Sequence, residues 1–224
     1  MQTGFHNNRE KTEIEAKFVC PDGVGLDDLL AAIDTINFKY TRENPCSQTD
    51  VYLDTSDYTL LNSDAALRIR RRGENYVGAY KASERQQGAI FERREFEWTL
   101  SNDEKKLWNE EKKPAIPPVL IEKLHLQGQA LRKVLVAETQ RHTAIIIGNE
   151  GFKAELSLDE VAFRGHKGQK TYREIEIELL SGQFEQLKQF ANSLQNQLKL
   201  QPAIDSKYKK GMILVGKYGV EPAI

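Results

Sequence analysis

Two short runs near the ends of the chain alternate charged with apolar side chains. They are Glu13-Ile14-Glu15-Ala16-Lys17 and Glu174-Ile175-Glu176-Ile177-Glu178. Successive side chains of an extended strand point to opposite faces, so each run predicts a strand with one ionic face and one apolar face. The apolar face is expected to pack on a core. The ionic face must then either meet bulk water or surround something charged.

The same period of two recurs elsewhere with the opposite charge. The run Leu67-Arg68-Ile69-Arg70-Arg71-Arg72 places its first, second and fourth arginines on one face, whereas Arg71 falls on the other. Acid-rich and arginine-rich strands are therefore separate, which favours two walls of one cavity that differ in sign. Further candidate strands cover residues 51–55, 76–81, 91–98, 139–147 and 152–163.

These segments give about eight strands, and an antiparallel barrel of about that size has room inside for side chains or one small ligand. A charged strand face is most often a solvated one, but the separation by sign favours a site. Two carboxylates ~5 Å apart repel by about 3 kcal/mol at an effective dielectric constant near 20, so acids clustered in a barrel call for a cation. We predict an α+β fold: an eight-stranded antiparallel β-barrel, or tunnel, with a charged lumen and helices covering its outside.

Four helices are expected from apolar residues at helical spacing, over residues 26–37, 103–111, 119–136 and 184–199. The proline-rich residues 112–118 would connect the second helix to the third. We expect a single domain over residues 1–224, with residues 1–9 disordered and a helical insert over residues 102–136. Residues 84–88 read as a polar loop, either a lid or idle, and both a monomer and a homodimer stay open.

The composition limits the classes of partner. With 32 Lys and Arg against 33 Asp and Glu, the net charge of −1 gives no overall field that attracts nucleic acid or a membrane surface. Two cysteines, Cys20 and Cys46, are too few for a disulfide scaffold or a zinc site. Neither a signal peptide nor a long apolar span is visible. The sequence thus predicts a cytoplasmic protein.

The order and spacing of several motifs resemble those of the CYTH superfamily, also called triphosphate tunnel metalloenzymes. The matching residues are Glu13-x-Glu15-x-Lys17, Tyr52-x-Asp54-Thr55, Leu67-Arg68-Ile69-Arg70, Lys81, Arg93-x-Glu95, Arg141, Leu158-Asp159, Glu174-x-Glu176-x-Glu178 and Ser206-Lys207-Tyr208. The resemblance implies an eight-stranded tunnel that acts on triphosphate groups with Mg²⁺ or Mn²⁺. The family includes inorganic tripolyphosphatases, thiamine triphosphatases, class IV adenylyl cyclases and fungal RNA triphosphatases.

The resemblance also implies roles for individual residues. Substrate phosphates would be bound by Lys17, Arg68, Arg70, Lys81, Arg141 and Lys207, with Arg72 and Arg93 as further candidates. Metal ligands would come from Glu13, Glu15, Asp159, Glu174, Glu176 and Glu178, with Glu155 as a further candidate. Which two of the last three glutamates bind metal stays open. The catalytic set would be Glu13, Glu15, Lys17, Lys81 and Glu176, with the general base unassigned.

The expected activity is metal-dependent hydrolysis of the terminal phosphate of a small-molecule triphosphate, inorganic or organic. The run 158–182, followed by Ser206-Lys207-Tyr208, looks closer to the bacterial inorganic triphosphatase branch than to the cyclases. A cyclase that makes cyclic AMP from ATP and a binder without chemistry stay open. The histidines His6, His125, His142 and His166 form no recognisable triad or metal pair, and Trp98 and Trp108 are assigned to packing.

Overall fold

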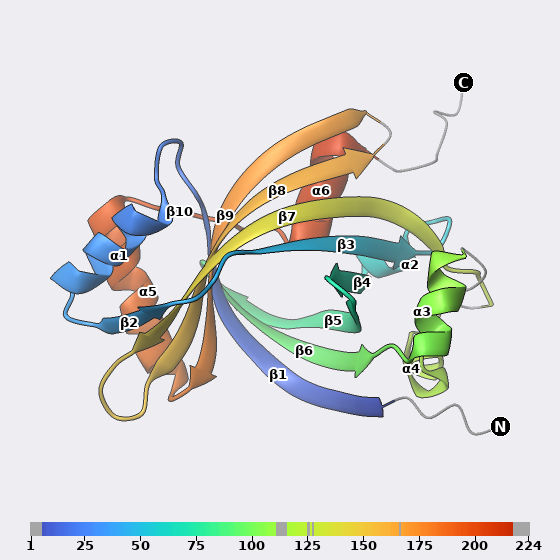
Figure 1. Ribbon diagram of the computed structural model, residues 1–224, viewed down its shortest axis with the longest axis horizontal. Coiled ribbons are helices and arrows are strands. Elements are labelled where there is room, and N and C mark those ends of the chain that lie inside the picture. The colour runs from blue at the N-terminus through green and yellow to red at the C-terminus, as the bar shows by residue number, and fades with distance from the viewer. Residues whose placement is uncertain (1–5, 111–115, 125, 127, 166, 217–224) are drawn as a thin grey trace.

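Eight long strands close into an antiparallel barrel in the computed structural model, which describes residues 6–110, 116–124, 126, 128–165 and 167–216. Around the barrel they follow the order β1 (His6–Val19), β6 (Ile90–Thr99), β5 (Asn75–Gln87), β4 (Ala65–Arg72), β3 (Cys46–Asp54), β7 (Arg132–Ile147), β8 (Lys153–Gly165) and β9 (Gly168–Ser181). Pairing of β9 with β1 closes the ring. The predicted fold class is confirmed (Figure 1).

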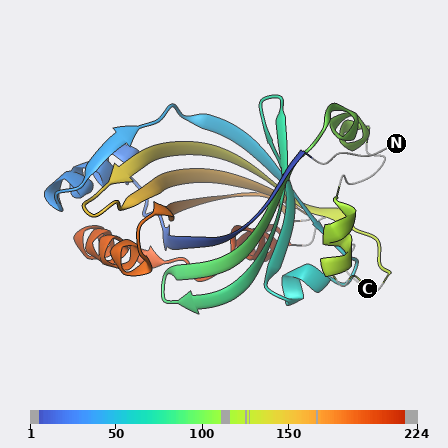
Figure 2. The same cartoon turned by 90° about the horizontal axis from the view of Figure 1, so that it is seen from below.

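Short strands and helices surround this barrel. Strand β2 (Lys39–Arg42) pairs with β7, and β10 (Gln201–Pro202) pairs with β1. The helices among the described residues are α1 (Leu26–Thr35), α2 (Thr59–Asn62), α3 (Asn102–Asn109), α4 (Pro118–Lys123), α5 (Phe184–Leu198) and α6 (Lys207–Val215). Helices α1 and α5 lie at one end of the molecule, and α3 and α4 lie at the other (Figures 1 and 2). None of the helices in the described part of the chain has the length and apolar character needed to cross a membrane.

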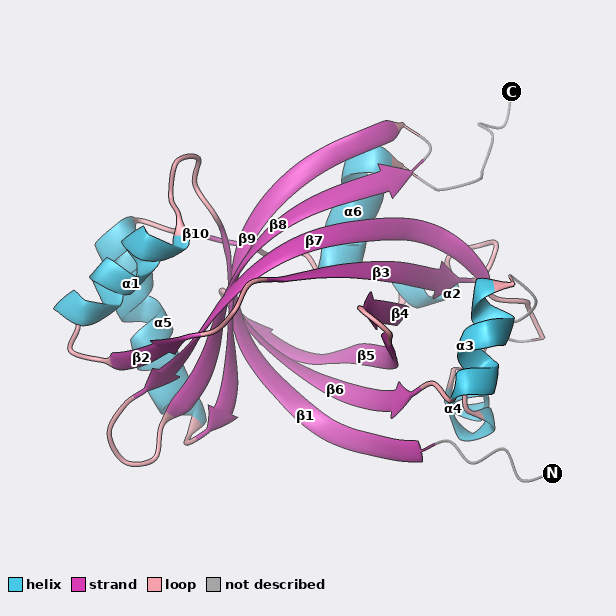
Figure 3. Cartoon of the chain, viewed as in Figure 1, coloured by secondary structure: helices cyan, strands magenta, loops and turns pink. Residues whose placement is uncertain are grey.

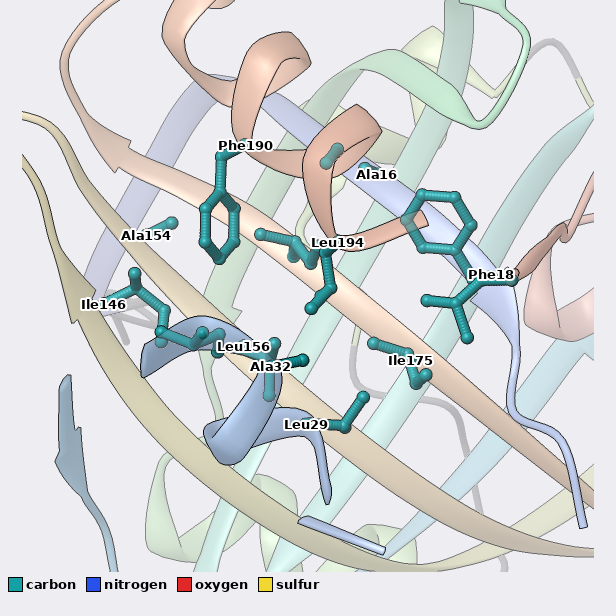
Figure 4. Packing of buried hydrophobic residues seen from close by; sticks show 14 of the residues in the cluster. Ala16, Phe18, Leu29, Ala32, Ile146, Ala154, Leu156, Ile175, Phe190 and Leu194 are labelled. Atoms are coloured by element: carbon teal, nitrogen blue, oxygen red, sulfur yellow. The ribbon is translucent and has the colours of Figure 1, made fainter. Parts of the chain in front are cut away.

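The apolar core lies between the outside of the barrel and the helices that cover it. Figure 3 shows the helices α1 and α5 together at one end of the barrel. Phe18 and Ile175 point away from the lumen and pack with Leu29 of α1 and Phe190 and Leu194 of α5 (Figure 4). Each such side chain, when fully buried, stabilises the fold by about 1.5–3 kcal/mol. Because the outer faces supply the core, the inner faces are free to be ionic.

A second outer cluster is built around Trp98 of β6. Its indole lies over Gly78 on the neighbouring strand, where a Cβ atom would come within 2.1 Å of the ring. Trp108 of α3 is buried in the same cluster. Both tryptophans therefore pack the barrel's outer layer, as predicted.

Three boundaries differ from those expected. The helix predicted over 119–136 ends at Lys123, and residues 132–136 instead begin β7. Val134 and Leu135 are both fully buried, and consecutive apolar residues of this kind suit a helix as well as a strand covered on both faces. The predicted helical insert is therefore shorter than 102–136, and residues 111–115 of the expected connection lie outside the described residues.

Residues 84–87, predicted to be a loop, extend β5 into a hairpin that turns at Gly88, whose φ of 60° suits glycine. Their side chains are all exposed, so they show no alternation between apolar and polar residues. At the amino terminus β1 begins at His6, so the predicted disorder of residues 6–9 is wrong. Residues 1–5 lie outside the described part of the chain.

Candidate active site

The inward side chains enclose a polar cavity of about 180 Å³. The predicted site residues that line it are Glu13, Glu15, Lys17, Arg68, Arg70, Lys81, Arg141, Glu176, Glu178 and Lys207, together with the further candidates Arg72, Arg93 and Glu155. Two more predicted residues, Asp159 and Glu174, lie in the wall of the barrel and are buried. Residues from both ends and the middle of the sequence therefore meet in one lumen.

One group of acids comes from neighbouring strands. Asp159 of β8 lies directly opposite Glu174 of β9, and Glu176 follows two residues later on the same face. One carboxylate oxygen from each lies within 4.8 Å of the others, so we call these residues the acid trio. Lys207, at the start of α6, places its Nζ 2.6 Å from Asp159 Oδ2 and 2.7 Å from Glu174 Oε1. This ammonium group balances part of the trio's charge.

Two more cations hold the acid trio in place. Arg141 donates from Nε and Nη2 to both carboxylate oxygens of Asp159, at 2.7 and 2.6 Å. Its Nη2 also donates to Glu176 Oε2 at 2.5 Å, and Lys17 Nζ donates to Glu176 Oε1 at 2.6 Å. Glu176 is thus fixed between a guanidinium and an ammonium group. Charge-assisted hydrogen bonds of this kind are among the strongest in proteins.

Glu13 and Glu15 form further ion pairs, and Glu15 is linked to the trio because Lys17 Nζ also lies 3.4 Å from Glu15 Oε1. Lys81 Nζ lies 2.5 Å from Glu13 Oε1 and 3.2 Å from an oxygen of Glu95. Arg93 Nη1 lies 3.0 Å from Glu15 Oε1. Acidic and basic side chains therefore interleave within the lumen.

Strands β8 and β9 set acid opposite acid, Asp159 to Glu174 and Glu155 to Glu178, whereas β4 carries arginines, so the expected separation by sign holds for these strands. It fails on β1 and β6, because each of these strands turns both acidic and basic side chains into the lumen.

Glu178 and Glu155 lie at the edge of this network. Glu178 accepts a hydrogen bond from Lys11 Nζ at 3.0 Å, and Lys11 also lies 3.2 Å from Glu95. Glu155 Oε1 lies 3.7 Å from Arg141 Nη1. Lys11 and Glu95 were not assigned a role from the sequence, although the period of two places Lys11 before Glu13 and Glu95 after Arg93.

Two arginines of β4 form ion pairs with an acid that was not among the predicted site residues. Asp50 of β3 is fully buried and lies opposite Arg70 in the strand register. Arg70 donates to it from Nε at 2.7 Å and from Nη2 at 2.8 Å, and Arg68 Nη1 lies 3.4 Å away. Asp50 shares a strand face with Tyr52, so the period of two could have placed it in the lumen. The predicted strand began at Val51, one residue too late to include it.

The pKa values show how the charges are shared. Burial raises the pKa of Glu174, and neighbouring Glu176 adds to this, against the attraction of Lys207. Burial also opposes ionisation of Glu176, but Lys17, Lys207 and Arg141 outweigh it and hold the pKa of that carboxyl well below its usual range. Within the trio, Glu174 is therefore the acid that is hardest to ionise.

Several buried polar atoms in the site make no hydrogen bond with the described residues. They include Glu13 Oε2, Arg68 Nε and Arg93 Nη2. Arg93 is 6% exposed and is held by Glu15 and by the ring of Phe91, 4.6 Å from its guanidinium carbon. Buried polar groups are nearly always paired in native proteins, so unpaired donors beside a cavity indicate a site for an anionic ligand.

The described histidine side chain takes no part in the site. His142 is half-buried on the face of β7 opposite to Arg141. His125 and His166 lie outside the described residues, as does the side chain of His6.

Comparison with known proteins agrees with this geometry. A model of the CYTH domain matches residues 11–211. A protein from Bacillus halodurans, described as a candidate adenylate cyclase, superposes with a TM-score of 0.61 at 22% identity, over 90% of this chain and 97% of that one. A candidate adenylyl cyclase from Hippeastrum, described as having a dominant triphosphatase activity, superposes with a TM-score of 0.60 at 18% identity, over 88% of this chain and 93% of that one. The PH1819 protein of Pyrococcus horikoshii gives 0.53 at 20% identity over 90% and 98%. At these identities the likeness is one of fold.

Proposed function

Because this chain belongs to the CYTH domain family, we propose that it is a divalent-metal-dependent hydrolase that removes the terminal phosphate of a triphosphate inside the barrel. The observation that carries the proposal is the lumen itself. It combines fixed guanidinium and ammonium groups with an acid trio whose oxygens lie within 4.8 Å of one another. A polyanion and a divalent cation each find complementary groups there.

The cations suit a linear triphosphate, which carries several negative charges at neutral pH. We assign substrate binding to Lys17, Arg68, Arg70, Lys81, Arg141 and Lys207. Arg93 joins them, because its buried Nη2 lacks a partner among the described residues and lies beside the cavity. Guanidinium groups bind phosphate oxygens in two places, whereas ammonium groups act as compact charges.

The acids suit a hard divalent cation. Mg²⁺ and Mn²⁺ prefer carboxylate oxygens over sulfur or nitrogen, and the trio offers oxygens alone. Asp159, Glu174 and Glu176 would hold the ion, and Glu13 has a buried oxygen free for a further contact. Such an ion, when bound, neutralises charge on phosphate oxygens. The pKa of Glu174 is raised even though Lys207 lies beside it, so a divalent cation, with twice the charge of an ammonium group, would favour its ionised form further.

The chain's own residues would then position the reactants. Arg68 and Arg70 hold the phosphates and balance the charge that accumulates on the leaving group. Lys17 orients Glu176 by its 2.6 Å hydrogen bond, and Lys81 orients Glu13 in the same way at 2.5 Å. These carboxylates, together with Glu15, place the attacking water. Phosphoryl transfer needs little beyond such positioning and electrostatic stabilisation.

The lining of the cavity favours inorganic tripolyphosphate over a nucleotide. Among the described residues its aromatic side chains are Tyr52 and Tyr208. These rings stack on each other with centroids 5.0 Å apart and are 2% and 1% exposed. They offer no free face on which adenine or a thiamine ring could stack. The triphosphatase activity named for the Hippeastrum protein also favours hydrolysis over cyclisation.

The direct test is to incubate the protein with tripolyphosphate, ATP or thiamine triphosphate, with Mg²⁺, with Mn²⁺ and with a chelator. We expect metal-dependent release of phosphate, fastest from tripolyphosphate. Glu176→Gln should abolish it, whereas Glu160→Gln, on the outer face of the neighbouring strand and 52% exposed, should not. Production of cyclic AMP would instead identify a cyclase, and binding without turnover would identify a carrier.

A further inference from the structure

The tunnel continues beyond the site described above into a second cavity at its rim. This rim cavity has a volume of about 390 Å³ and shares Arg68, Arg70 and Arg72 with the main one. Side chains two apart on a strand share a face, so the three arginines form a row that extends over ~13 Å of β4. We call it the arginine row. It runs from the lumen to the hairpin between β4 and β5.

Neighbouring strands complete the rim cavity. Arg70 lies opposite Val77 of β5, and Val77 lies opposite Thr99 of β6. Arg72 lies opposite Asn75, the first residue of β5. The cavity therefore opens where β5 begins and β6 ends, at the end of the barrel covered by α3 (Figure 1).

The charge of the arginine row is compensated unequally along its length. Arg70 forms a two-pronged pair with the buried Asp50. Arg72 donates instead to the neutral amide oxygen of Gln48, at 2.7 Å. Arg72 is exposed, and within the described residues it has no carboxylate within salt-bridge distance, so its charge is available to a ligand in the rim cavity. The acid that lines this cavity is Glu97, one negative charge against three positive ones.

The arginine row is chemically suited to bind a linear polyphosphate. Each planar guanidinium group can bind two phosphate oxygens, so a row of them suits a linear chain of phosphates. The rim cavity is lined by no aromatic side chain among the described residues, and Asn75 and Thr99 supply further hydrogen-bonding groups. A nucleobase would find no stacking surface there, whereas an additional phosphoryl group would find an uncompensated arginine.

We propose that the rim cavity is a subsite for phosphoryl groups beyond the third, so that linear polyphosphates of four or more phosphates bind along the arginine row with Arg72 as the outer contact. This inference rests on the proposed function, because it extends the same lumen. In this proposal Arg72 sets the preference for longer phosphate chains, and the inner cations position the first three phosphates.

The test compares tripolyphosphate with linear tetraphosphate as substrates of the wild type, Arg72→Gln and Arg71→Gln. Arg71 is the matched control, since it is adjacent in sequence but points outward and donates to the Gly73 carbonyl. For Arg72→Gln we expect kcat/KM to fall about fivefold more for tetraphosphate than for tripolyphosphate, the effect of one partly exposed ion pair. Arg71→Gln should leave the ratio of the two unchanged.

Other outcomes would overturn the inference. Equal losses of kcat/KM on both substrates would make Arg72 a long-range attractor of anions. If the wild type releases no phosphate from tripolyphosphate, the proposed function fails by itself. The inference is then tested by calorimetry, which measures the binding of tripolyphosphate and of tetraphosphate in the presence of a chelator. Arg72→Gln must weaken tetraphosphate binding more than tripolyphosphate binding, and equal weakening or none would refute it.

Discussion

Replacing Asp50 with asparagine would remove the charge that pairs with Arg68 and Arg70 of the arginine row, with almost no change in volume. Asp50 is fully buried and Arg70 is 16% exposed, so the pair is largely shielded from water. Removing one partner of a buried pair costs about 3–5 kcal/mol, and the retained amide oxygen and the partial exposure of Arg70 reduce this to about 2–3 kcal/mol. For a chain of this size that loss lowers the melting temperature by roughly 5–10 °C.

The same substitution should change the response to ligand. With Asp50 neutral, Arg68 and Arg70 lack their carboxylate, and a bound phosphate can supply the missing negative charge. Calorimetric melting with and without tripolyphosphate should therefore show that the ligand raises the melting temperature of Asp50→Asn more than that of the wild type. Asp64→Asn is the control, because Asp64 is 66% exposed and its change should be within about 0.5 kcal/mol. A variant as stable as the wild type, or a smaller ligand-induced rise, would refute this account of the arginine row.

Further predictions concern packing, substrate capture and pH. Gly78→Ala should destabilise the protein by about 1–3 kcal/mol in urea unfolding, because the new methyl group would press on Trp98. Unchanged stability would contradict the close approach of the indole to Gly78. Arg70→Ala should raise KM for tripolyphosphate about tenfold or more, since it removes a charged hydrogen-bonding group, and an unchanged KM would exclude the phosphate contact. The arginines hold the pKa of Asp50 far below its ordinary value, against the effect of burial. Its stabilising contribution is therefore present above the unfolded pKa of about 3.9 and is lost as pH falls through the folded value. The difference in unfolding free energy between the wild type and Asp50→Asn should accordingly narrow below about pH 4, and a constant difference across acid titration would contradict the assignment.

The barrel was predictable because its strands carry the period-two signal at full strength. Runs such as Glu174 to Glu178 have one face in the outer core and the other in the lumen, so charged and apolar side chains alternate without interruption. The signal failed where one of these conditions was absent. At 134–136 β7 is apolar on successive residues, and the segment was taken for a helix. At 84–87 β5 is exposed on both faces, and the segment was taken for a loop.

The candidate site was predictable residue by residue but not in its pairing. The alternation of side chains along each strand places Glu13 and Glu176 on the inner face. It does not show that Glu13 pairs with Lys81, or that Glu176 pairs with Lys17 and Arg141. Those partners depend on strand order and register, which only the closed structure fixes. Asp50 was missed because the predicted strand began at Val51, and its role became visible only with the arginines opposite it.

The central claim is that the lumen holds a polyanion and that the acid trio holds the accompanying divalent cation. The most direct measurement is a crystal structure with Mn²⁺ and a non-hydrolysable imido analogue of tripolyphosphate, with the ion located by its anomalous scattering. The account predicts an anomalous peak in contact with oxygens of Asp159, Glu174 and Glu176, and phosphates beside Arg68 and Arg70. A peak bound only to outer acids, or an analogue bound outside the barrel, would contradict it.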